Sequence, residues 1–222
     1  MRNIKLSQVK WRKRSARTVG VMLMAMLAVM PAISAAGCGQ TRLTLDNIQT
    51  QKGFTILAQE RTEVTLTLPF AEMPSYDAAA AEAKMEPICV YADDGAEIVL
   101  HTVAVYGSEP GGIDEDIMQL GFDIRHTLRD AGTTLTVHRV LNEGGNVTYS
   151  SEFYIADRTV QSGGTAYADA VNEMGSGPSD NFWVYMDADI YASLTGDASF
   201  GVTLNALTYA RGSETREFGR AE

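Results

Sequence analysis

Five residues near the C-terminal end combine aromatic rings with carboxylates at alternate positions of one segment: Trp183, Tyr185, Asp187, Asp189 and Tyr191. The residues between them are apolar, so a strand over Phe182–Tyr191 would place all five on one face. Rings of this kind stack on the apolar faces of sugars, and carboxylates accept hydrogen bonds from sugar hydroxyls or hold a cation. The alternation predicts a ligand-binding face. The alternative is that aromatic residues are simply good strand formers on a half-exposed face.

Catalytic and metal-binding motifs are not recognisable in the rest of the chain. The three histidines, His101, His126 and His138, are far apart in the sequence, and no Gly-x-Ser-x-Gly elbow accompanies them. Zinc sites need closely spaced His and Cys residues, which the chain lacks. The segment from Asp187 does not continue as a calcium loop, because Ala192 and Ala198 occupy the glycine and glutamate positions. We therefore expect no catalytic residue, no metal site and no cofactor.

The charge of the chain changes sign at Cys38. Seven of the 18 Lys and Arg residues precede it, whereas all 28 Asp and Glu residues follow it, so the later part carries a formal charge of 11 − 28 = −17. A surface this acidic repels nucleic acid and anionic lipid head groups. We expect no nucleic-acid partner.

The first 38 residues have the organisation of an export signal. A basic leader precedes the uncharged run Thr18–Ala36, which ends in small residues before Cys38. The tetrapeptide Ala35-Ala36-Gly37-Cys38 resembles the lipobox of bacterial lipoproteins, whose signal peptidase cleaves directly before the cysteine. This resemblance covers the leader alone. It implies a lipid-modified Cys38 that holds the protein on the outer face of the cytoplasmic membrane.

Two other fates of the leader remain open. Ordinary signal-peptidase cleavage after the small residues would release a soluble secreted protein. Without cleavage, the apolar run would anchor the chain, with the basic leader held inside. All three fates place the remainder outside the cytoplasm.

The hydrophobic pattern after the leader predicts an α+β fold, a mainly antiparallel sheet with one long helix packed on it and one or two short helices. The alternative is a β-sandwich with helical insertions. The long helix is expected over Asp114–Ala131, where Ile117, Leu120, Ile124 and Leu128 recur at helical spacing. The other expected elements are short helices at Tyr76–Met85 and Thr165–Met174, and strands at Gly53–Leu57, Thr62–Phe70, Ile88–Tyr91, Glu97–Tyr106, Phe182–Tyr191 and Ser199–Tyr209, with a hairpin around 142–146.

These patterns divide the chain into a signal peptide (1–37), a lipidated N-terminus and tether (38–52), one α+β domain (53–210) and a charged tail (211–222). The function expected from them is that of a non-catalytic binding or accessory module at the cell surface, with a cell-wall glycan or a protein as its partner. The alternative is a small hydrolase that acts on cell-envelope glycan or peptide through two carboxylates, because such a pair needs no fixed sequence spacing.

Overall fold

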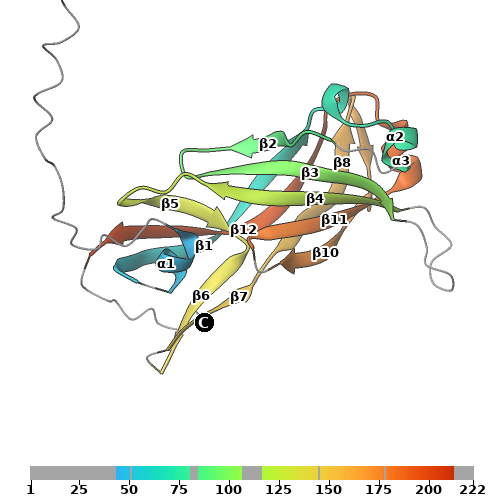
Figure 1. Cartoon of the computed structure of the whole chain (residues 1–222). Coiled ribbons are helices and arrows are strands. Elements are labelled where there is room, and N and C mark those ends of the chain that lie inside the picture. Colours follow the sequence, from blue (N-terminus) through green and yellow to red (C-terminus); the bar gives the residue numbers. More distant parts are fainter. Residues whose placement is uncertain are drawn as a thin grey trace, which may run out of the picture. The chain divides into compact units, whose positions relative to one another are not determined.

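Antiparallel strands dominate the computed structural model, which describes residues 44–50, 52–80, 85–106, 117–144, 146–177 and 179–212. All of them belong to one compact unit, Thr41–Glu222 (Figure 1). The helices in this part of the chain are short. The expected α+β class with a long helix is therefore wrong, and the alternative, a β-sandwich with helical insertions, is closer to the structure.

The strands form two five-stranded antiparallel sheets and one hairpin. Sheet A contains β1 (Phe54–Leu68), β12 (Ala198–Arg211), β8 (Tyr154–Ser162), β9 (Thr165–Tyr167) and β5 (Ala131–Thr136). Sheet B has the order β10 (Val171–Gly177), β11 (Asn181–Asp187), β4 (Ile117–His126), β3 (Ala96–Tyr106) and β2 (Ile88–Ala92). The hairpin consists of β6 (His138–Glu143) and β7 (Asn146–Ser151).

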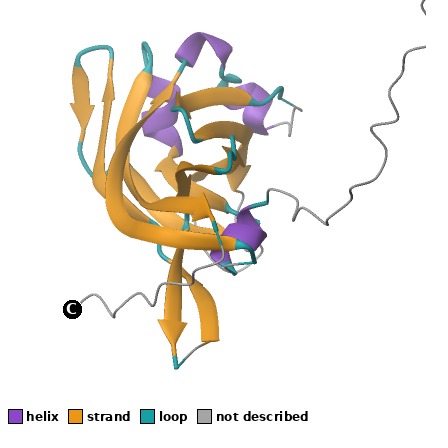
Figure 2. Cartoon of the chain, turned by 90° about the vertical axis from the view of Figure 1, so that its left-hand side faces the viewer, coloured by secondary structure: helices purple, strands orange, loops and turns teal. Residues whose placement is uncertain are grey.

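The short helices lie at the margins of the sheets. They are α1 (Leu45–Gln49), α2 (Tyr76–Ala80), α3 (Ala188–Ser193) and a 3₁₀ turn, η1 (Phe70–Glu72). Figure 1 shows α2 and α3 together at one end and α1 at the other, so none of these helices covers the outer face of sheet B. In Figure 2 the long strands curve around the core, and the β6–β7 hairpin projects below it. No helix of the described residues is long and apolar enough to cross a membrane.

Aromatic side chains join the two sheets in the main core. Phe122 of β4 stacks on Phe182 of β11, with ring centroids 4.9 Å apart. Phe200 of β12 meets Phe122 edge-on, and Phe153 lies 4.5 Å from Phe182. Each fully buried ring contributes roughly 1.5–3 kcal/mol through the apolar surface that it removes from water. Contacts between Phe122 and Phe200 therefore hold sheet B against sheet A.

Strand β4 replaces the long helix expected over Asp114–Ala131. The helical stripe omitted Met118 and Phe122, whereas a period of two places Met118, Leu120, Phe122 and Ile124 on one buried face. A strand therefore buries these four apolar side chains together, whereas a helix would direct them to different faces. Residues 114–116, expected as the acidic start of the helix, lie outside the described residues.

Two further expectations are corrected by the strand pairing. The segment expected as a helix over Thr165–Met174 forms β9 and most of β10. The strands expected at Gly53–Leu57 and Thr62–Phe70 are one strand, β1, which continues across a bulge between Ile56 and Ala58 because β12 pairs with its whole length. The strands expected at Ile88–Tyr91 and Glu97–Tyr106 are present and pair as β2 and β3, and the hairpin expected around 142–146 is present too.

A second, smaller core lies at the α1 end of the unit. Ile48 of α1 is fully buried there with residues of β1, β6 and β12: Phe54, Ile56, Val140, Leu207 and Tyr209. The β6–β7 hairpin is attached by Gln59, whose side-chain amide bonds both the N–H (2.9 Å) and the carbonyl (2.5 Å) of Val140. Part of the expected tether is thus packed on the body. The leader, Cys38 and the tail from 213 onward lie outside the described residues.

Candidate functional site

Strand β11 places two residues of the predicted ligand-binding stripe on the outer face of sheet B. Phe182, Val184 and Met186 point into the core and are buried. Trp183 and Tyr185 alternate with them and are half-buried. The alternation holds up to Met186.

The remaining three residues of the stripe do not continue this face, because the strand ends at Asp187. The Asp187 carboxylate accepts hydrogen bonds from the N–H groups of Asp189 (2.9 Å) and Ile190 (3.1 Å), which makes it the N-cap of α3. Asp189 is exposed on that helix. Tyr191 is buried, and its hydroxyl donates to the carbonyl of Pro74 (2.6 Å). The five residues therefore do not share one surface.

Glycines surround Trp183 on the outer face of sheet B. Its register partners in the neighbouring strands are Gly121 of β4 and Gly175 of β10. The far edge of its indole lies over Gly177, where a Cβ atom would come within 3.3 Å of Cη2. Neither register partner carries a side chain, and a Cβ atom at Gly175 would meet nothing within 4 Å. The result is a shallow aromatic platform.

Polar side chains border this platform on β3 and β4. The ring of His101 lies over Gly121, where a Cβ atom would be 3.0 Å from its Cε1. His101 Nε2 is 3.5 Å from Asp123 Oδ1, and His101 Nδ1 is 2.8 Å from Thr102 Oγ1. Gln119 pairs with Tyr185 in the register. Gln119 and Asp123 were not identified as site residues because a helix was expected over 114–131. In the observed strand, a period of two from Ile117 places both on one face with Gly121.

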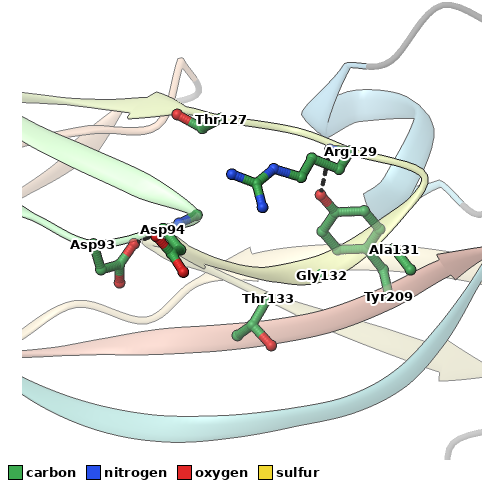
Figure 3. A pocket seen from close by; sticks show the side chains of 9 residues that line it. Asp93, Asp94, Thr127, Arg129, Ala131, Gly132, Thr133 and Tyr209 are labelled. Carbon is green, nitrogen blue, oxygen red and sulfur yellow. Dashed lines mark hydrogen bonds between the residues drawn. The ribbon is translucent and has the colours of Figure 1, made fainter.

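A pocket of about 480 Å³ lies between the β2–β3 turn and the β4–β5 connection (Figure 3). Asp93 and Asp94 lie on one wall and Arg129 on the other, above Thr133 and Tyr209. Tyr91 beside this wall donates to Asp93 Oδ2 (3.3 Å). Desolvation by partial burial, followed by the charge of Asp93 and this hydrogen bond, raises the pKa of the Tyr91 hydroxyl. The sequence did not identify this pocket, because its walls come from two strands, β5 and β12, and from two loops that are distant in the chain.

A buried polar cluster joins β4, β5 and the turn before β11. His126 Nε2 lies 2.8 Å from Asp180 Oδ2, with 13% and 6% of the two side chains exposed. Asp180 Oδ1 accepts hydrogen bonds from Thr136 Oγ1 (2.9 Å) and from the N–H of Val137 (2.8 Å). Asp180 has a positive φ of 59°. Asp is one of the few residues that tolerate this conformation, because its side chain can hydrogen-bond locally.

The order Asp180–His126–Thr134 resembles a catalytic acid, imidazole and hydroxyl, but the hydroxyl is not available as a nucleophile. His126 Nδ1 lies 2.9 Å from Thr134 Oγ1. Thr134 Oγ1 donates its hydrogen to the carbonyl of Gly95 (2.9 Å), and Thr134 is 1% exposed. A nucleophile needs its proton directed at the base and its oxygen open to substrate. The cluster is therefore structural.

The carboxylates of the pocket also lack the geometry for hydrolysis. Asp93 and Asp94 are neighbours on one turn, and Arg129 lies on the other wall. Asp93 Oδ1 is occupied by the N–H groups of Gly95 and Ala96. Glycoside hydrolysis needs two carboxyl groups on opposite sides of the scissile bond.

Within the described residues, no group of three or more His, Cys, Asp or Glu side chains is placed to hold a metal ion.

Comparisons of the chain with protein-family models, with curated proteins and with solved structures find no match.

Proposed function

We propose that the protein is an exported, lipid-anchored cell-surface module that binds cell-envelope glycan through the outer face of sheet B. The observation that carries this proposal is the Trp183 platform: an indole over Gly177 whose register partners are also glycines. A sugar ring can approach the indole from the β10 side, where a Cβ atom at Gly175 would meet nothing within 4 Å. The export part rests on the leader and the Ala35-Ala36-Gly37-Cys38 tetrapeptide.

The groups beside the platform suit the hydroxyls of a sugar. Asp123 accepts hydrogen bonds, and Gln119 and His101 can both donate and accept. Nearly half of the Asp123 side chain is exposed (46%), so its oxygens remain accessible. The rings supply apolar contact area, while the polar groups determine orientation, which is the usual division of labour in a binding site.

Sedimentation with purified, insoluble cell-wall glycan tests this proposal. The full-length protein in mild detergent should sediment with the glycan, and Trp183→Ala should weaken its affinity at least about tenfold, a loss of about 1.4 kcal/mol. The matched control is Tyr149→Ala, which removes another exposed ring (44% exposed) from β7. If both variants bind as well as the parent protein, or if the parent does not bind, the platform is not a glycan site.

The same preparation distinguishes the alternatives for export and catalysis. Mass spectrometry of the N-terminus should find a lipid-modified Cys38, and an unmodified N-terminus elsewhere would contradict the anchor while leaving the glycan result intact. Release of soluble fragments from the glycan, abolished by replacing a carboxylate, would favour the hydrolase.

A further inference from the structure

The pocket between the β2–β3 turn and the β4–β5 connection has one rigid wall formed by the turn. Asp93 Oδ1 accepts hydrogen bonds from the N–H groups of Gly95 (2.8 Å) and Ala96 (2.7 Å). The carbonyl of Gly95 accepts from the N–H of Thr127 (2.9 Å). Gly95 packs so closely on β5 that a Cβ atom would lie 1.8 Å from the carbonyl oxygen of Thr133. These contacts hold the turn, and with it Asp94, in one position.

The opposite wall is anchored through the main chain of Arg129. Its N–H donates to the hydroxyl of Tyr209 (3.1 Å), which is 1% exposed and packs edge-on against Phe54. The bond fixes the backbone of the connection and leaves the guanidinium free to extend into the pocket, as Figure 3 shows. Both walls are therefore formed before any ligand arrives, which lowers the free-energy cost of binding.

Two opposite charges face this pocket without neutralising each other. Asp94 and Arg129 are both exposed, and neither makes an ion pair within the part of the chain that the structure describes. The nearest acid in the sequence, Asp130, is engaged by Arg211 at 2.7 Å. The Asp94 carboxylate is thus available to bind a cationic group of a ligand, and the Arg129 guanidinium is available to bind a carboxylate.

We propose that this pocket binds a small zwitterion, a molecule with one ammonium and one carboxylate group, such as an amino acid or a dipeptide. Arg129 binds the carboxylate through its paired N–H donors, and Asp94 binds the ammonium. A simple anion is disfavoured by Asp93 and Asp94, and a simple cation is disfavoured by Arg129. The volume of about 480 Å³ accommodates ligands of this size. The proposal uses none of the residues of the Trp183 platform.

Calorimetric titration of the full-length protein in mild detergent tests the proposal. The probes are glycine, γ-aminobutyrate and alanyl-alanine, whose charges are separated by increasing distances. Ethylamine and N-acetylglycine each carry one of the two charges alone. At least one of the three zwitterions should bind saturably, and both single-charge probes should bind at least about tenfold more weakly, since each loses one charged contact.

Substitutions then assign the two contacts. Arg129→Gln and Asp94→Asn should each weaken the binding of the preferred zwitterion at least about tenfold. Arg158→Gln, which changes an exposed arginine of β8 outside the pocket, is the matched control and should leave binding unchanged. All three side chains are exposed, so circular dichroism and melting should remain those of the parent. Absence of saturable binding by all three zwitterions, or equal binding of N-acetylglycine or ethylamine, would overturn the proposal.

Discussion

Two histidine–aspartate pairs, one buried and one on the surface, differ in what the protein can use them for. In the interior, His126 Nε2 and Asp180 Oδ2 lie 2.8 Å apart. On the outer face of sheet B, His101 Nε2 and Asp123 Oδ1 lie 3.5 Å apart, with 27% and 46% of the side chains exposed. The same residue types therefore occupy two environments of different polarity within one unit.

The interior pair is committed to structure by its other contacts. Asp180 Oδ1 binds Thr136 and the backbone of Val137, and His126 Nδ1 is bonded to Thr134. Water does not compete strongly at this depth, so each contact is worth more than on the surface, and losing one partner is correspondingly expensive. The surface pair makes fewer fixed contacts and lies beside the Trp183 platform. Burial thus separates a structural pair from a pair that can serve a ligand.

Asp180→Asn should have the largest effect on stability. Asparagine keeps the shape, tolerates the positive φ and still accepts hydrogen bonds from Thr136 and Val137, but it removes the negative charge that faces His126. We expect a loss of about 3 kcal/mol in the free energy of unfolding, measured by urea titration. A loss below about 1 kcal/mol would mean that the contact between Asp180 and His126 contributes little.

Tyr191→Phe should have an intermediate effect and tests a buried hydrogen bond without a charged partner. At neutral pH it removes the bond to the carbonyl of Pro74, at a cost of about 1 kcal/mol. Burial raises the pKa of Tyr191 to about 12, from an ordinary value of 10. The folded protein thus retains this proton more strongly, and the contribution is present below about pH 10 and is lost as the pH rises towards 12. Urea titrations across this range should show a weaker alkaline decline for Tyr191→Phe; equal declines would contradict the assignment.

Asp123→Asn should have the smallest effect on stability, within about 0.5 kcal/mol of the parent, because an exposed ion pair contributes little in water. It is the same chemical change as Asp180→Asn, so the two urea titrations compare the buried and the exposed environment. A loss similar to that of Asp180→Asn would show that exposure does not explain the difference between the pairs.

Local patterns predicted strands correctly where one periodicity fitted the segment. Val64, Leu66 and Leu68 alternate with threonines, and they form the buried face of β1. The Asp-Gly turn at 94–95 joins β2 and β3, as its residue types indicate. The error over 114–131 arose because Leu120, Ile124 and Leu128 also fit a helix. Pairing with β3 and β11 on both sides decides between the two periods, and no local pattern contains that information.

The candidate sites show the same limit. Alternation alone correctly placed Trp183 and Tyr185 on one face. The strand was expected to continue to Tyr191, because an alternating pattern does not reveal that Asp187 caps a helix. Asp93, Asp94 and Arg129 come from a turn and a connection that are distant in the chain. Spacing cannot bring them together, so their pocket was not predicted.

The sequence by itself determined the acidic character of the chain after Cys38, the basic charge and the apolar run before it, and the strands whose side chains alternate without ambiguity. These properties depend on composition and on neighbours within a few residues. Tertiary structure decided that 117–126 is a strand, that His126 and Asp180 form a buried pair, and that glycines lie beside Trp183. Each of these depends on contacts between segments remote in sequence, whose free energy outweighs the small differences in local propensity.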